Sequence, residues 1–258
     1  MISKESGSSY KNAENPAASG QTSMYDRGRD YIDQIKAQEA APVYRTHQAD
    51  PEQYILDLGR RLGKKQGEFT IADRELLPED IRTELIDGVI YLMASPTQRH
   101  QIVAGQIYHQ LCSFIYSRDG GCTPFIAPSD VNLDEDDKTV VQPDVYIECK
   151  KTGQDDAPDT DKKESDNNDT VPDFIAEVLS PSSRKKDMFT KTAKYCSAGV
   201  REYWIVDPVK EKVIVHRFEN ESDTSIYGFD CCVPVGIYDG ACRIDFPQIR
   251  ERVDRYFR

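Results

Sequence analysis

Two acidic residues lie inside segments of the chain that are otherwise apolar. Asp144 interrupts the stretch from Val140 to Ile147, and Glu177 interrupts the stretch from Phe174 to Leu179. An ionised carboxylate among apolar side chains is costly unless a cation or hydrogen bonds compensate its charge. If the two segments pair as strands, the acids converge and offer the oxygen ligands that Mg²⁺ and Mn²⁺ prefer. The alternative, which the bare pattern favours, is that each acid caps a strand end or joins a salt bridge.

A helix predicted soon after Glu177 carries the next candidates. Four of its residues fall at i, i+4, i+7 and i+8 and therefore share one face: Asp187, Lys191, Lys194 and Tyr195. A lysine directed at two metal-bound acids can orient an attacking water or stabilise the charge of a phosphoryl transition state. The alternative is an exposed ion pair between Asp187 and Lys191, worth about a few tenths of a kcal/mol.

Two further polar residues and a serine cluster complete the candidates. Glu84 opens a predicted strand, where it serves either as an outer carboxylate of the site or in a cross-strand charge pair. His100 has a weaker claim, because a single histidine usually satisfies a local hydrogen bond or lies exposed. Ser180, Ser182 and Ser183 lack the G-x-S-x-G pattern of a hydrolase nucleophile. The chain also has no glycine-rich phosphate loop.

The elements that must position these residues follow from apolar periodicity and turn signals. Asp87-Gly88 joins two apolar runs and indicates a type I′ hairpin, whose turn residues both need positive φ. A core-facing helix is expected over 97–117, and another from Ser182 or Ser183 to Ser197. Strands are expected at 83–86, 89–93, 125–133, 140–149, 174–179, 202–206, 212–218 and onward to 244, and shorter helices near 51–62, 70–77 and 247–257. This order predicts an α/β (α+β) fold, in which helices flank a mixed central β-sheet.

Length and composition place these elements in one domain. Hydrophobic residues make up 38% of the 258-residue chain, and no apolar run approaches the roughly 18 to 20 residues of a membrane span. We expect a disordered or extended segment at 1–48, a short helical lead-in at 49–68, and the folded domain at 69–258 with an exposed acidic insertion at 150–170. The N-terminus has no signal-peptide pattern, which predicts a cytoplasmic protein. The seven cysteines are odd in number, lack metal-ligand spacing and are expected to be reduced.

The charge of the chain is unevenly distributed. The net charge of −12 argues against a surface coated for nucleic acid. Residues 177–217, however, hold nine Lys or Arg against five acids. Four basic residues of this stretch are candidates for contacts with backbone phosphates: Arg184, Lys185, Lys186 and Lys194. The net charge therefore does not exclude nucleic acid as a partner.

In their order along the chain, these blocks resemble the Uma2 family of the PD-(D/E)xK, restriction-endonuclease-like superfamily. The matching stretches are Glu84–Gly88, Met93–Pro96 with His100, Pro143–Val145, Glu177–Ser183, Asp187, Lys191, Tyr195 and Gly199–Pro208. The resemblance implies a restriction-endonuclease-like fold and metal-dependent cleavage of nucleic acid phosphodiester bonds. It makes Asp144 the acid of the PD element and Glu177 the acid of the (D/E)xK element, both binding Mg²⁺ (or Mn²⁺).

The third position of the (D/E)xK element departs from the superfamily pattern. Leu179 stands there, as is usual in this family, and Lys191 matches a lysine relocated to the helix. Glu84 matches an early acid counted with the site. The leading hypothesis is therefore a Mg²⁺-dependent endonuclease that acts on nucleic acid, with DNA favoured and a homodimer left open. The competing hypothesis is a non-catalytic binding or scaffold protein that keeps the fold, which the net acidity and the missing in-motif lysine favour.

Overall fold

The structure is a computed structural model. It describes residues 50–118, 121–133, 137–150, 171–181, 183–219 and 223–258. The predicted N-terminal segment 1–48 and residues 151–170 of the predicted insertion lie outside the described residues. Among the described residues, no helix combines the length and the apolar character that crossing a bilayer requires.

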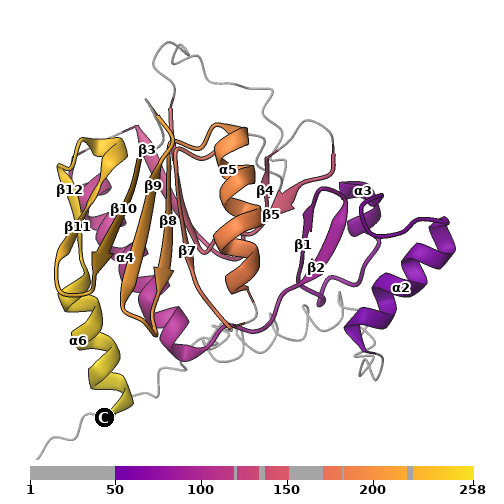
Figure 1. Ribbon diagram of the computed structural model, residues 1–258, viewed down its shortest axis with the longest axis horizontal. Helices are drawn as coiled ribbons and strands as arrows, with labels where there is room; N and C mark the ends of the chain where they lie inside the picture. Colours follow the sequence, from indigo (N-terminus) through magenta and orange to yellow (C-terminus); the bar gives the residue numbers. More distant parts are fainter. Residues whose placement is uncertain (1–49, 119–120, 134–136, 151–170, 182, 220–222) are drawn as a thin grey trace, which may run out of the picture. The chain divides into compact units, whose positions relative to one another are not determined.

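A six-stranded mixed sheet forms the centre of the fold (Figure 1). Its strand order is β10-β9-β8-β7-β6-β3, in which β7 and β8 are parallel and the other neighbours are antiparallel. The two parallel strands are buried along their whole length, as expected where both faces of a sheet are covered. The strands are β3 (Cys122–Ile126), β6 (Val145–Cys149), β7 (Phe174–Val178), β8 (Glu202–Asp207), β9 (Lys212–Arg217) and β10 (Asp223–Gly228).

Alternation along β7 assigns its side chains to two apolar layers. Phe174, Ala176 and Val178 belong to one layer. They pack against α4 (Gln98–Tyr116), α6 (Phe246–Phe257) and a two-stranded hairpin. The hairpin consists of β11 (Cys232–Val235) and β12 (Cys242–Asp245), and the 3₁₀ turn Gly236–Tyr238 follows β11. Ile175 belongs to the other layer, with α5 (Thr192–Ala198), and Figure 1 shows α5 in front of the sheet and α4 behind it. Glu177 has the parity of Ile175 and points toward α5. The predicted fold, a mixed central sheet flanked by helices, is confirmed.

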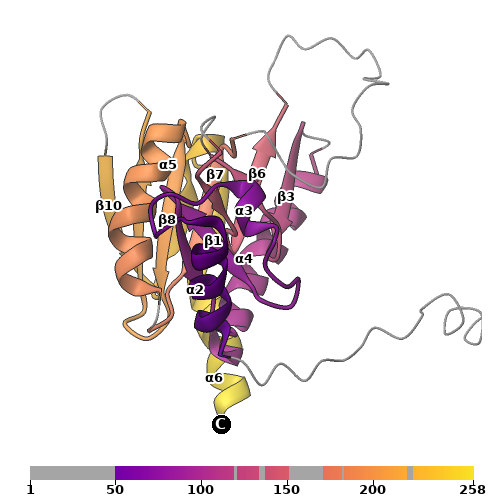
Figure 2. The ribbon, with the colours of Figure 1, turned by 90° about the vertical axis from the view of Figure 1, so that its right-hand side faces the viewer.

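A smaller sheet of strand order β2-β1-β5-β4 carries Glu84. The predicted hairpin is confirmed, because Asp87 (φ 51°) and Gly88 (φ 71°) both adopt the left-handed conformation that a type I′ turn needs. Leu85 packs against α2, so Glu84, one residue earlier, points to the opposite face. Figure 2 shows α2 and α3 on the near side of this sheet. The elements are β1 (Thr83–Ile86), β2 (Val89–Leu92), β4 (Val131–Asn132), β5 (Val140–Val141), α2 (Pro51–Leu62) and α3 (Ile71–Arg74).

The expected strands 125–133 and 140–149 are each divided in two. Pro128 stands at the break between β3 and β4, and Pro143 at the break between β5 and β6. Proline lacks the N–H that a strand ladder needs, so each break falls where pairing is interrupted. The second break leaves Asp144 just before β6, at the end of the ladder.

Two local features differ from expectation. The helix expected from Ser182 or Ser183 to Ser197 is present, but it contains a π-helix, Lys186–Lys191, before α5 continues it. Cys122 and Cys149, expected as thiols, form a disulfide, because the register of β3 and β6 places them directly opposite each other. Neither feature has a local sequence signal, since both depend on which segments pack together.

Candidate active site

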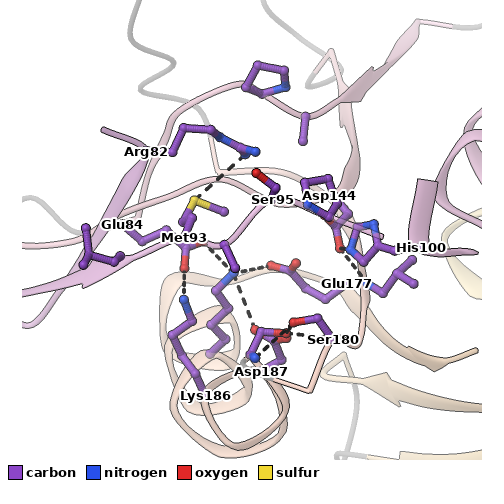
Figure 3. Close-up of a pocket in the computed structure, with 18 of the residues that line it drawn as sticks. Arg82, Glu84, Met93, Ser95, His100, Asp144, Glu177, Ser180, Lys186 and Asp187 are labelled. Carbon is purple, nitrogen blue, oxygen red and sulfur yellow. Dashed lines mark hydrogen bonds and ion pairs between the residues drawn. The ribbon is translucent and has the colours of Figure 1, made fainter. Parts of the chain in front are cut away.

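A cavity of about 150 Å³ lies where β1, β7, the residue before β6, the start of α4 and the π-helix meet (Figure 3). These segments are far apart in the sequence. Its lining includes the four residues that the sequence predicts as catalytic: Glu84, Asp144, Glu177 and Lys191. The structure therefore brings the predicted set together in one place.

Asp144 and Glu177 are neighbours across two antiparallel strands. Val145 of β6 pairs with Ala176 of β7, so the register places Asp144 opposite Glu177. Asp144 Oδ2 accepts a hydrogen bond from the backbone N–H of Val178 at 2.7 Å and lies 3.1 Å from His100 Nε2. The convergence expected from the sequence is thus a consequence of strand pairing.

Glu177 is buried and its hydrogen bonds converge on one oxygen. Lys191 Nζ and the Tyr195 hydroxyl both donate to Glu177 Oε1 at 2.7 Å. Burial raises the pKa of Glu177 to about 8, with Lys191 opposing the rise and the charge of Asp144 adding to it. Glu177 therefore holds its proton near neutral pH until a cation offsets the cost of the charged form.

Lys191 is the centre of the charged network. It is 2% exposed, and its Nζ lies 2.6 Å from Glu84 Oε1 as well as 2.7 Å from Glu177 Oε1. Burial alone would lower the pKa of Lys191, but the attraction of these carboxylates raises it well above its ordinary value. Although burial disfavours ionisation of Glu84, Lys191 and Lys186 lower its pKa to about 2. The ammonium and the Glu84 carboxylate are therefore both charged.

The π-helix brings three charged side chains to the cavity: Lys186, Asp187 and Lys191. Such widened turns are common at functional sites, because they change the direction in which side chains leave the helix. Asp187 lies 3.7 Å from Lys191, and burial raises its pKa. The alternative of an exposed Asp187–Lys191 pair is wrong, because both residues are buried.

Three of the four cations expected to contact phosphates form ion pairs within the fold. Arg184 binds Asp207 at 2.8 Å, Lys186 binds Glu84, and Lys194 binds Asp87. Lys185 is exposed. The ion pairs leave Lys185 as the member of this set that is most accessible to a ligand.

His100 and Tyr195 each contact one of the two paired acids, His100 at Asp144 and Tyr195 at Glu177. His100 lies in the first turn of α4, where its backbone N–H donates to the capping Thr97 hydroxyl at 3.2 Å. Its position three residues after a capping threonine indicates a helix start, but nothing local shows that Asp144 faces it. Tyr195 follows Lys191 by one helical turn, and this spacing is the available signal that both reach the same acid.

The acids in the cavity outnumber the ammonium groups that contact them. Four carboxylates line it, against two lysines: Glu84, Asp144, Glu177 and Asp187, with Lys186 and Lys191. When all four are ionised, the lysines leave two negative charges uncompensated. Within the described residues, no group of three or more His, Cys, Asp or Glu side chains is arranged to hold a metal ion.

The mixed sheet, with its paired acids and a lysine from the adjoining helix, places the protein among restriction-endonuclease-like folds. A solved structure shares the fold at a TM-score of 0.59 and 18% identity, covering 72% of this chain and 99% of that chain. It is described as a putative nuclease belonging to DUF820 from Anabaena variabilis ATCC 29413. Residues 70–228 match Uma2, described as "Putative restriction endonuclease", and the chain belongs to this family. No curated protein matches the chain.

Proposed function

We propose that the protein is a metal-dependent endonuclease that hydrolyses phosphodiester bonds of nucleic acid, with DNA as the first substrate to test. The observation that carries the proposal is the meeting of Asp144, Glu177 and Lys191 in one cavity, with Glu84 bound to the same lysine. Membership of a family described as a restriction endonuclease supports it, as does the fold shared with the Anabaena protein.

The free oxygens of the two paired acids fit Mg²⁺ or Mn²⁺. Within the described residues, the contacts to Asp144 go to Oδ2 and those to Glu177 go to Oε1. Asp144 Oδ1 and Glu177 Oε2 are therefore the atoms that would hold the ion. Mg²⁺ commonly binds through one or two carboxylates and completes its coordination with water and substrate phosphate. Two acids are thus a sufficient set, and a divalent cation would offset the cost of the charged form of Glu177.

A bound Mg²⁺ or Mn²⁺ supplies charge stabilisation at the phosphoryl oxygens and lowers the pKa of an attacking water. Lys191 and Tyr195 fix the rotation of the Glu177 carboxylate by donating to the same oxygen. The 3.7 Å between Lys191 Nζ and Asp187 is too long for a hydrogen bond, which leaves part of the ammonium for a water or a phosphoryl oxygen. Glu84 keeps Lys191 charged and in place.

Hydrolysis of labelled DNA and RNA, each with Mg²⁺ or Mn²⁺, tests the proposal. We expect Asp144→Asn and Glu177→Gln each to lower the rate by about 10²- to 10³-fold, the loss typical of removing one group that stabilises the transition state. Calorimetry should show Mg²⁺ or Mn²⁺ binding that Asp144→Asn abolishes. Glu211→Gln is the matched control, because Glu211 is a surface acid paired with Arg250.

The same experiments separate the nuclease from a scaffold that retains the fold. A scaffold has no reason to bind a divalent cation through Asp144. Failure to hydrolyse every substrate, or hydrolysis that neither acid substitution lowers below the Glu211→Gln control, would reject the nuclease.

A further inference from the structure

Arg82 lines the same cavity but takes no part in the network of carboxylates and lysines. It immediately precedes β1, two residues before Glu84, so alternation directs both side chains to the cavity face of the small sheet. In Figure 3 its guanidinium points toward Ser95, away from Glu84 and Lys186. The cavity therefore has a cationic side chain apart from its cluster of acids.

The guanidinium of Arg82 is held by uncharged groups. Its Nη2 donates to Gln142 Oε1 at 2.9 Å and lies 4.0 Å from Met93 Sδ. Its Nε is buried and has no hydrogen-bond partner. Among the described residues, no carboxylate lies within ion-pair distance of it; the nearby Glu84 is bound by lysines. Its Nη1 has no hydrogen-bond partner in the described part of the chain, and unlike Nε it is not buried, so the two N–H groups of Nη1 and the charge remain for a ligand.

The partner of Arg82 is itself fixed in orientation. Gln142 Nε2 donates to Asp130 Oδ1 at 2.7 Å, and Asp130 also forms two bonds with Arg74. Because its nitrogen is committed to Asp130, the amide must present its oxygen to Arg82. An acid in place of Gln142 would neutralise the guanidinium, whereas the amide orients it and leaves it charged.

We propose that Arg82 binds a phosphate oxygen of the nucleic acid and positions the phosphodiester in the cavity. The planar fork of a guanidinium matches phosphate oxygens, and a phosphodiester is the anion that the proposed function, on which this inference rests, brings here. Three of the four basic residues expected to contact phosphates are already paired with acids. Of those three, Lys186 also lines the cavity, but Glu84 neutralises it. Arg82 differs from all three because its charge has no acid partner among the described residues.

Fluorescence anisotropy with labelled DNA and RNA oligonucleotides tests this role, in a Glu177→Gln background that slows hydrolysis. Arg82→Met should weaken binding by about 10- to 100-fold, the loss of one charge-assisted contact. It should also reduce the slope of log affinity against log salt by about one. Arg82→Lys keeps the charge, so the slope should persist while affinity falls, because an ammonium lacks the fork. Arg250→Met, which removes the same charge from a surface pair with Glu211, should change neither quantity.

The outcomes are distinct from those of the hydrolysis test. Binding that depends on Arg82 in a wild-type protein that cleaves nothing would support the phosphate contact and reject the nuclease. If Arg82→Met matches Arg250→Met in affinity and slope, or if neither DNA nor RNA binds, the inference is overturned. Unfolding followed by fluorescence of the buried Trp204 shows whether each variant is folded. If Arg82→Met does not fold, Arg82→Lys decides: lower affinity at an unchanged slope supports the contact, and unchanged affinity overturns it.

Discussion

Replacing Lys191 with methionine keeps most of the side chain's length and removes the ammonium that Glu84 and Glu177 share. Both acids are buried, so bulk water cannot take its place. Glu84 is ionised, since its two lysines lower its pKa to about 2 despite burial. The substitution therefore leaves a buried carboxylate with Lys186 as its cationic partner.

The expected loss of stability follows from these contacts. Removing one partner of a buried ion pair costs about 3 to 5 kcal/mol. We expect the lower end at pH 7, because Lys186 still contacts Glu84 and because burial raises the pKa of Glu177 to about 8, so that this acid can stay neutral. For a folded unit of this size, about 3 kcal/mol lowers Tm by about 6 to 12 °C.

Urea and thermal unfolding can be followed by the fluorescence of Trp204, which is the single tryptophan and is fully buried. Lys194→Met is the matched control, because it makes the same change one helical turn later. Lys194 pairs with Asp87, whose side chain is 61% exposed. A pair so close to the surface is worth about 0 to 1 kcal/mol, so the control should stay close to wild type.

A double substitution identifies the cause of the loss. Adding Glu84→Gln to Lys191→Met removes the uncompensated charge and should recover about 0.5 to 3 kcal/mol, the range of coupling between residues in contact. If Lys191→Met is no less stable than Lys194→Met, the ammonium does not compensate the buried acids. Additive losses in the double variant would show that Glu84 is not the acid left uncompensated.

Two further predictions concern Glu177. Without metal, the stability of wild type relative to Glu177→Gln should fall as the pH rises from about 4.5 to 8, because the raised pKa lets folded Glu177 keep a proton that the unfolded chain has lost. In urea unfolding, the slope of this stability difference should reach at most about 1.4 kcal/mol per pH unit. A stability difference that rises or stays flat over this range would contradict the pKa shift. Tyr195→Phe removes the hydroxyl that donates to Glu177 and should weaken Mg²⁺ binding by about 10- to 100-fold in calorimetry. The control Tyr203→Phe loses a hydrogen bond to the Asp187 backbone carbonyl and should leave the Mg²⁺ affinity unchanged. Equal Mg²⁺ affinities of the two variants would show that the Tyr195 hydroxyl does not orient Glu177.

The features that the sequence predicts well are those with a local physical cause. The Asp87-Gly88 turn follows from the backbone freedom that positive φ demands, and it fixes the end of β1 and the pairing of β1 with β2. An acid among apolar residues has to meet a compensating group, which made Asp144 and Glu177 candidates. The pattern by itself favoured a strand-end cap or a salt bridge, and the resemblance to the family turned the interpretation toward a metal site.

The features that the sequence does not predict depend on packing between distant segments. Gln142 connects Asp130 and Arg82 through its amide, and the sequence separation of these three residues hides this contact. Nothing around His100 in the sequence indicates its contact with Asp144, because that contact depends on the packing of α4 against the sheet. The π-helix likewise has no local sequence pattern that would predict it. Its lysines Lys186 and Lys191 contact Glu84 and Glu177, which lie on two different strands.

The location of Lys191 follows from the surroundings of residue 179. Leu179 is buried in the apolar layer that contains Ile175 and Tyr203, so a lysine there would bring a charge into that layer. The ammonium instead comes from the π-helix and reaches the same acid, Glu177, at 2.7 Å. Its effect on a carboxylate depends on where the nitrogen lies, not on which element carries it. The missing in-motif lysine, which favoured a scaffold at the level of sequence, therefore gives no reason to expect an inactive site.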